Sequence, residues 1–395
     1  MIPELRKSFN AQWSPDLYSE FLRRIDEVSG THVSFRCSET PVFLPKPLLD
    51  KMVRYGEELC QQLVSNPEYR AASDSAIPPS FRVPNEPDHP LFVQADFGLV
   101  RGDDGGFEPK LVEIQGFPSL YALQPALAKE YETVYRLNEK LNASLTTFLG
   151  GLNEQSYLEL LRSAILNGHA SEEVILLEIE PYTQKTLADF LLTQKMLGIK
   201  IACITEVKKR ERKLYFEGVE IKRIYNRAIA DELLRKGIRA DFQFTDDVEI
   251  EWAGHPNWFF RLSKFSLPWF RHVSVPETRF LSDVKELPEN LDEYVLKPLY
   301  SFAGLGVRIG PTRDEIAAIP ENERSNFILQ RKMDFVPTID TPSGMTKAEI
   351  RIMYIWDREL VPVTTIIRTG RGKMMGVDFN KNLDWIGASA GFYIA

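Results

Sequence analysis

Apolar residues recur at helical spacing through the first 64 residues of the chain. Leu17, Phe21 and Ile25 lie on one stripe, and residues 47–64 carry a second. A polar stretch with many prolines follows and ends near residue 90, where a regular helix cannot continue. The pattern predicts an N-terminal helical region over residues 1–88.

The next segments have the apolar and turn-forming positions of paired strands. Residues 91–101 and 107–115 read as two strands, and the sequence GDDGG between them predicts a β-hairpin with a glycine-rich turn. Helical spacing then returns, and we expect one long helix from about Leu123 to Phe148 to close this part of the chain.

Residues 151–254 have the pattern of an α/β unit. Runs at 174–181 and 199–205 flank a helical run at 183–197, which predicts a β-α-β unit, and residues 213–225 read as a second hairpin. Because parallel strands joined by a helix form one layer, we expect this stretch to fold as a unit.

The remaining chain is rich in predicted strands. Residues 294–299 and 327–333 read as single strands, and a strand-rich portion runs from Ala348 to Ala395. The fold class is therefore mixed α/β (α+β). We expect residues 89–150 and 255–395 to form one domain, with the α/β unit inserted between them.

Composition and charge narrow the function. The 395 residues are 44% apolar and 26% charged, as in ordinary globular proteins, and their length suggests two or three structural units. A formal charge of -8 argues against nucleic acid or an anionic membrane as a partner, because both require a basic surface. Any phosphate site must then be local.

Cysteines and hydropathy indicate the compartment. Cys37, Cys60 and Cys203 are far apart and lack the spacing of a disulfide framework or a zinc site. The first residues lack the apolar core of an export signal, and no stretch reaches the roughly 18 apolar residues of a membrane span. We expect a cytoplasmic protein.

One segment combines a strand, a lysine and a glycine-rich loop. Lys297 ends the strand YVLKP, and the loop from Ser301 to Gly306, which includes Gly304, leads into a second strand-like run. Backbone N–H groups of such a loop can surround phosphate oxygens while the lysine offsets their charge. The alternative is a plain hairpin with a solvated lysine.

The hairpin at 91–115 brings oxygen donors together. With the turn at Asp103 and Asp104, Asp96 falls roughly opposite Glu113, and Gln115 projects to the same face. Two opposed carboxylates repel each other unless a cation lies between them, which favours Mg²⁺. A pairing of one carboxylate with an Arg or Lys, or a register shifted by one residue, explains the same pattern.

Two further residues are candidates for a nucleotide site. Lys264 lies among aromatic and apolar residues, where an ammonium needs an anion unless its stem extends to solvent. Gln330 ends the strand NFILQ, ahead of a short linker where adenine could bind to backbone groups.

In chain order, the sequences ADF, LVEIQGFPS, LSKFSLPWF, YVLKPLYSFAGLGV and FILQ resemble the ATP-grasp superfamily, specifically its circularly permuted branch typified by glutathionylspermidine synthase. The resemblance runs from about Phe92 to the C-terminus. It implies an ATP-grasp domain with a lid at about residues 285–330, and a pre-ATP-grasp-like unit at 151–254. It also implies Mg²⁺ ligands at Asp96, Glu113 and Gln115, and ATP contacts at Lys264, Lys297, Ser301, Gly304, Gly306 and Gln330.

The resemblance implies an ADP-forming ligase. ATP would phosphorylate a small-molecule or peptide carboxylate, an amine would attack the acyl phosphate, and ADP and phosphate would leave. Magnesium and the lysines would offset charge on the phosphoryl group, and the loop from Ser301 to Gly306 would close as a lid to exclude water. Neither the acid, the amine nor the oligomeric state can be identified.

Three departures from the family pattern affect the choice of substrate. Gln94 stands where the branch has an arginine, Gln115 replaces an asparagine, and Phe302 replaces an arginine that holds substrate. Glutathione and spermidine are therefore poor substrate candidates. The rival function is an ATP-binding protein with reduced catalysis that acts as a sensor or partner-binding module.

Other residues could compensate for the lost charge. Arg351 and Arg368 lie on late strands that the fold would direct toward the phosphates, and Arg227 could hold a substrate carboxylate. Each could equally be a structural ion-pair partner. Ser119 is a weaker candidate for substrate contact, and the pair Asp378 and Asn380 is read as a turn.

Overall fold

The computed structural model describes residues 1–299, 306–372, 375 and 382–395. Its centre is a five-stranded antiparallel sheet in the order β18-β17-β16-β2-β3. The strands are β2 (Phe92–Arg101), β3 (Phe107–Gln115), β16 (Lys347–Trp356), β17 (Leu360–Gly370) and β18 (Gly387–Ser389). The hairpin and the late strands expected from the sequence are confirmed.

The register of the hairpin matches the prediction. Asp96 pairs with Glu113, and Gln94 pairs with Gln115. The register shifts just beyond, because Phe97 pairs with Leu111, so the β3 strand has one extra residue at this point. Such a bulge increases the local twist and redirects side chains.

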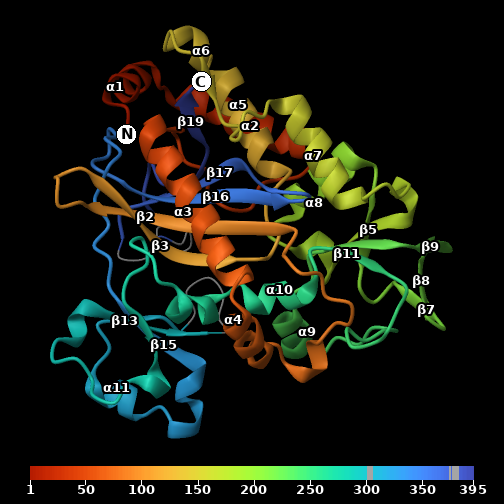
Figure 1. Cartoon of the computed structure of the whole chain (residues 1–395). Helices are drawn as coiled ribbons and strands as arrows, with labels where there is room; N and C mark the ends of the chain where they lie inside the picture. The colour runs from red at the N-terminus through yellow and green to blue at the C-terminus, as the bar shows by residue number, and fades with distance from the viewer. Residues whose placement is uncertain (300–305, 373–374, 376–381) are drawn as a thin grey trace.

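The N-terminal helices share hydrophobic cores with later segments rather than forming a core of their own. They are α1 (Pro3–Gln12), α2 (Pro15–Ser29), α3 (Lys46–Val64) and α4 (Pro67–Ala72). The α3 helix crosses the large sheet (Figure 1) and shares a hydrophobic core with β2, β3 and β16. The α2 helix packs on α5 (Leu123–Tyr135) and α8 (Leu187–Leu197).

The prediction of one long helix between Leu123 and Phe148 is wrong. The α5 helix ends at Tyr135, because Arg136 adopts a left-handed conformation with φ of 48° and its N–H bonds to Glu132. A short helix α6 (Leu137–Lys140) follows, and then β4 (Leu145–Thr146). A three-stranded sheet joins β4 to β19 (Gly391–Ile394) and β1 (Val42–Phe43).

The predicted β-α-β unit is confirmed. After α7 (Glu154–Leu166), a parallel sheet in the order β11-β10-β5-β6 contains β5 (Val174–Glu178), β6 (Lys200–Cys203), β10 (Arg223–Asn226) and β11 (Glu251–Ala253). The α8 helix joins β5 to β6. A small antiparallel sheet of β7 (Lys208–Arg210), β8 (Lys213–Phe216) and β9 (Val219–Ile221) contains the predicted hairpin, and α9 (Ala230–Lys236) follows β10.

A second antiparallel sheet lies beside the large one. Its order is β12-β15-β13-β14, with β12 (Thr278–Phe280), β13 (Tyr294–Pro298), β14 (Arg308–Ile309) and β15 (Phe327–Arg331). With α11 (Arg313–Ala317) it forms a separate lobe below the large sheet in Figure 1. Its own small core includes Leu296 and Ile316. Between the lobes run α10 (Pro256–Arg261) and a short 3-10 helix, Lys264–Trp269.

The described helices include none that combines the length and apolar character needed to cross a membrane.

Candidate functional site

One face of the large sheet carries a cluster of buried charges. Asp96 on β2 lies between Glu113 on β3 and Arg351 on β16, as the registers of both strand pairs require. Glu349, two residues before Arg351, shares its face by the two-residue period of a strand, and it pairs with Arg368 on β17. Four neighbouring strands thus bring these five side chains together.

Arg351 binds Asp96 with two parallel hydrogen bonds. Its Nε donates to Asp96 Oδ1 at 2.5 Å and its Nη2 donates to Oδ2 at 2.6 Å. Asp96 is 0% exposed. Burial alone would raise the pKa of Asp96, but the attraction of Arg351 and Arg368 outweighs burial and lowers that pKa.

Arg368 links two carboxylates on the same face. Its Nη1 donates to Glu349 Oε1 at 2.7 Å and its Nη2 donates to Asp96 Oδ2 at 3.1 Å. The Arg368 side chain as a whole is 28% exposed. Burial raises the pKa of Glu349, with Arg368 opposing and the nearby carboxylates adding to the rise.

The second antiparallel sheet, β12-β15-β13-β14, contributes lysine and glutamine side chains. Lys297 Nζ donates to Gln330 Oε1 at 2.6 Å, across the paired strands β13 and β15, and Gln330 Nε2 donates to Thr278 Oγ1 at 3.0 Å. Burial lowers the pKa of Lys297 to about 8, with Glu113 and Glu349 opposing this and Lys264 adding to it. Burial also lowers the pKa of Lys264, against the attraction of Glu113.

The two lobes meet near the cluster, because Leu299 and Ile328 of the second lobe share a hydrophobic core with residues of β2 and β3. Lys297 and Lys264 both interact electrostatically with Glu113, although they come from segments far apart along the chain. The structure therefore brings Lys264 and Lys297, two of the predicted nucleotide ligands, near Glu113, one of the predicted metal ligands. It adds Arg351 and Arg368 to them, the two arginines suggested as replacements for lost charge.

The linker after Gln330 crosses the large sheet closely. Val336 N donates to Leu99 O at 2.8 Å. The ring of Phe335 lies over Gly98, where an added Cβ would approach Phe335 Cε1 to 2.1 Å. Gly98 is therefore the residue that lets the linker lie against β2, next to Asp96.

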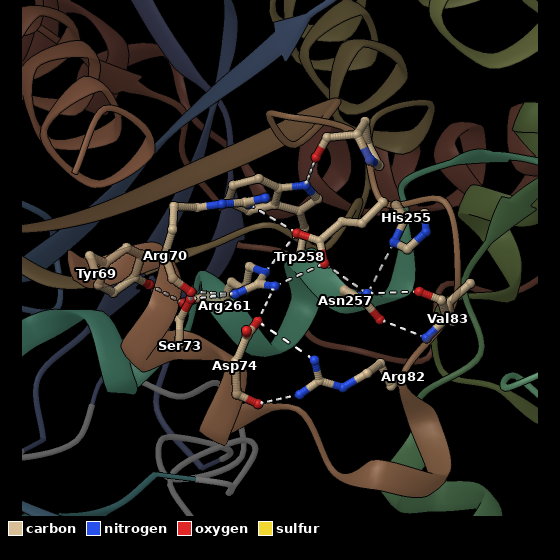
Figure 2. Close-up of polar contacts among 12 residues, drawn as sticks. Tyr69, Arg70, Ser73, Asp74, Arg82, Val83, His255, Asn257, Trp258 and Arg261 are labelled. Carbon is tan, nitrogen blue, oxygen red and sulfur yellow. Dashed lines mark hydrogen bonds and ion pairs between the residues drawn. The ribbon is translucent and has the colours of Figure 1, made fainter. Parts of the chain in front are cut away.

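A network of buried polar groups holds the segment that precedes Lys264. Figure 2 shows Arg261 among Arg70, Ser73 and Asp74. Its Nη1 donates to Ser73 Oγ at 2.6 Å and its Nη2 donates to Asp74 Oδ1 at 2.6 Å. Its Nε donates to Glu86 Oε1 at 2.6 Å. All three nitrogens of the guanidinium therefore have oxygen partners.

The same network attaches α10 to the proline-rich connection. Asn257 exchanges hydrogen bonds with the backbone of Val83, at 2.9 and 3.0 Å, as Figure 2 shows, and it also donates to Glu86. Gly116 N, beyond β3, donates to Leu262 O at 3.3 Å. Because Leu262 is two residues from Lys264, these contacts fix the lysine relative to the strand that carries Glu113.

Other predicted site residues lie elsewhere or outside the described residues. Arg227 is 2% exposed and its Nη1 donates to Asp189 Oδ2 at 2.8 Å, an ion pair that the sequence left open as an alternative. Ser119 accepts through its carbonyl from Gln94 Nε2 at 2.8 Å. Gly306 has a φ of 74°. Ser301, Phe302, Gly304, Asp378 and Asn380 lie outside the described residues.

Sequence reasoning missed Glu349 and the role of Gln94. Glu349 stands two residues before Arg351 in the strand EIRIMYIW, and this spacing could have shown that both side chains share one face. Gln94 accepts from Arg351 Nη1 at 2.8 Å. The Gln94 amide thus binds a guanidinium supplied by another strand.

The three residues predicted to bind Mg²⁺ do not fit that ion in this arrangement. Both Asp96 oxygens accept from Arg351, and Glu113 Oε1 lies 3.8 Å from Arg351 Nη2. The amide oxygen of Gln115, in the orientation that satisfies both groups, accepts from the same nitrogen at 2.5 Å. No three His, Cys, Asp or Glu side chains among the described residues form a metal-binding group.

Solved structures of other proteins have a fold similar to that of this chain. No protein-family model and no curated protein matches it in sequence. It is similar in structure to a glutathione synthetase-like effector, GSS30, from Globodera pallida in its apo form, with 13% identity and a TM-score of 0.58. The match covers 95% of this chain and 98% of that one. The chain therefore has a glutathione synthetase-like fold of the mixed α/β class.

Proposed function

We propose that this protein binds ATP in a circularly permuted ATP-grasp site and uses it to join a carboxylate to an amine. The observation that carries the proposal is the meeting of Lys264 and Lys297 with Glu113 between the two lobes. Partly buried lysines with lowered pKa values are destabilised as cations, and a polyphosphate between the lobes would relieve this. The glutathione synthetase-like fold agrees with a ligase.

The lysines and the linker would hold the nucleotide. Lys297 and Lys264 would bind phosphate oxygens, and the hydrogen bond from Lys297 to Gln330 holds the ammonium in place before ATP binds. Adenine would lie along the linker of residues 332–336, whose backbone passes from β15 of the second antiparallel sheet to β2. Gln330 thus acts in this proposal by orienting Lys297.

Arg368 is placed to stabilise the transferring phosphoryl group. Its guanidinium bridges Asp96 and Glu349 on a side chain that is 28% exposed, and a planar fork of donors suits phosphate oxygens. The substrate carboxylate oxygen would attack the γ-phosphorus, and ADP would leave. The amine would then attack the acyl carbon, with loss of its proton to solvent and departure of phosphate. No step is assigned to a metal.

Arg227 and Ser119 are the residues proposed to contact the substrates. Arg227, proposed from the sequence to hold a carboxylate, lies over Phe117, with 5.3 Å from its guanidinium carbon to the ring centroid. Phe117 follows the end of β3 by two residues, so Arg227 and Ser119 flank one end of the site. In this role Arg227 would exchange its bond to Asp189 for one to the substrate.

A second candidate function is ATP binding with little or no turnover. The observation that favours it is the pair of hydrogen bonds from Arg351 to both carboxylate oxygens of Asp96, which the family uses to bind its metal. Such a protein would respond to ATP by closing its lobes and would present a different surface to a partner.

Measurement of ADP release separates the two functions. ATP, with and without Mg²⁺, is incubated with amino acids, peptides and polyamines, and products are identified by mass spectrometry. A ligase releases ADP only with an acid and an amine together, and Lys297→Ala abolishes the release, whereas Lys285→Ala, at an exposed position of the same lobe, does not. ATP binding without turnover on the whole panel favours the second function. A phosphorylated product that accumulates would instead indicate a kinase.

A further inference from the structure

The Arg351 guanidinium takes the position that a metal would need between Asp96, Glu113 and Gln115. It contacts Asp96 through Nε and Nη2, and Gln115 through Nη1 and Nη2 at 3.2 and 2.5 Å. Glu113 is the most distant of the three, at 3.8 Å. Mg²⁺ requires oxygen ligands at about 2.0–2.1 Å in octahedral geometry, which this set cannot supply while the guanidinium is present.

Arg351 is fixed in this position by its surroundings. It is 7% exposed and lies on the central strand β16, directly opposite Asp96 on β2. Gln94 Oε1 accepts from Nη1 at 2.8 Å, so every nitrogen of the guanidinium has a partner. Gln94 itself is 0% exposed and donates to Ser119 O. Withdrawal of Arg351 would leave Asp96 and Gln94 buried without these bonds.

The substitution at position 94 agrees with this arrangement. An arginine at position 94, as in the family pattern, would place a second guanidinium against Arg351 in a buried site, where like charges repel strongly. A glutamine offers an acceptor instead. Gln94 and Arg351 therefore form a matched pair, in which the cation comes from β16 rather than from β2.

Two of the three carboxylates of the cluster, Asp96 and Glu349, have guanidinium partners without a metal. Asp96 binds Arg351 and Arg368, and Glu349 binds Arg368. In a site of free carboxylates, a polyphosphate would be repelled unless a divalent cation lay between the two groups of negative charge. Here guanidinium groups have that place, and Lys264 and Lys297 lie near Glu113 in the same cluster.

We propose that Arg351 replaces the divalent cation at this site, so that the protein binds nucleotide phosphates without Mg²⁺. This inference rests on the proposed function, because it assumes that ATP binds between the lobes. It distinguishes the chain from proteins in which the metal accompanies the nucleotide into the site.

The test compares the affinity for ATP in EDTA and in excess Mg²⁺ by isothermal titration calorimetry. We expect the two dissociation constants to agree within about threefold, less than 1 kcal/mol. Tightening by Mg²⁺ of more than about tenfold, or 1.4 kcal/mol, overturns the inference and leaves the proposed function intact. Absence of ATP binding in both solutions overturns the proposed function and the inference together.

A substitution of Arg351 provides a second test, because ATP binding by the variant should depend on Mg²⁺. Arg351→Met removes the guanidinium and frees the oxygens of Asp96, Glu113 and Gln115, so we expect its ATP binding to weaken in EDTA and to recover with Mg²⁺. Arg331→Met, at a side chain 56% exposed, is the control and keeps the wild-type behaviour. A folded Arg351→Met protein that binds ATP equally in both solutions contradicts the inference. If this variant does not fold, the wild-type comparison decides.

Discussion

Arg261 and Lys297 are both cations withdrawn from solvent, yet their surroundings shift their pKa values in opposite directions. Burial would lower the pKa of Arg261, but its hydrogen bonds to Glu86 and Asp74 outweigh burial and raise that pKa. Burial lowers the pKa of Lys297, and its bonded partner Gln330 is uncharged. A cation neutralised by its own fold is typical of a structural element, whereas a cation destabilised by its fold favours a bound anion.

The largest expected effect is loss of stability at Arg261. Arg261→Met leaves Glu86 and Asp74 without their buried partner, and we expect a loss of about 3–5 kcal/mol in the free energy of unfolding, measured in urea. Arg82 also binds Asp74 but is 50% exposed, so Arg82→Met should change the free energy by less than about 1 kcal/mol. Equal losses for both variants would show that burial does not distinguish these arginines.

Lys297 is expected to affect function more than stability. Lys297→Met removes a positive charge next to the proposed phosphates, and we expect ADP release to fall by about 10²–10³-fold. Lys285→Met, at an exposed lysine of the same lobe, is the control. If Lys297→Met releases ADP like the wild type, the lysine does not contact the transferring group. The lowered pKa of Lys297 would then not indicate a bound anion, in contrast to the interpretation given above.

The lowered pKa of Lys297 predicts opposite pH trends for stability and for ATP binding. Between its folded pKa of about 8 and its usual value near 10.5, the unfolded chain holds a proton that the folded chain has lost. Stability of the apo protein therefore gains from Lys297 as pH rises through this window. ATP affinity falls over the same window, by up to about tenfold per pH unit, because the cation is lost.

Lys297→Met provides the reference for both trends. Thermal unfolding and calorimetry at pH 7 to 10 are compared between the wild type and this variant, so that other titrating groups cancel. The difference should grow in favour of the wild-type apo protein above pH 8. A difference that stays constant with pH would mean that Lys297 titrates normally.

The smallest effect is expected at Thr278. Its hydroxyl accepts from Gln330, which in turn orients Lys297. Thr278→Val removes this acceptor, and we expect ATP affinity to weaken by about 1 kcal/mol, roughly fivefold. Thr278→Ser keeps the hydroxyl and should bind ATP like the wild type. Weakening in Thr278→Ser as well would assign the effect to the lost methyl group.

Local signals are sufficient to predict the hairpin. The turn GDDGG sets the register of β2 against β3 as far as the pair Phe97 and Leu111, and the bulge just beyond that pair brings Glu113 opposite Asp96. The helix beyond is shorter than its apolar spacing predicts, because no residue type in the sequence marks Arg136 as left-handed. The packing of α3 on the large sheet also depends on contacts between distant segments.

The cation between the carboxylates could not be assigned from sequence. Arg351 lies 255 positions after Asp96, and only the pairing of β16 with β2 brings the two together. Two alternatives, a metal and an arginine, satisfy the same pair of carboxylates. The choice depends on tertiary register, which no local pattern contains.

The pairing of β2 with β16 also has a consequence for how the chain folds. The parallel sheet of residues 174–253 is assembled from strands close in sequence, whereas β2 and β16 are joined only by closing a loop of some 255 residues. Because loop closure slows folding, we expect the parallel sheet to form first and the large sheet last. Pulse-labelled hydrogen exchange should show early protection in β5 and β10 and late protection in β2. A newly made chain would therefore pass through an intermediate in which the hairpin edge that later meets β16 is open to other strands, and a chaperone would be most useful at that stage.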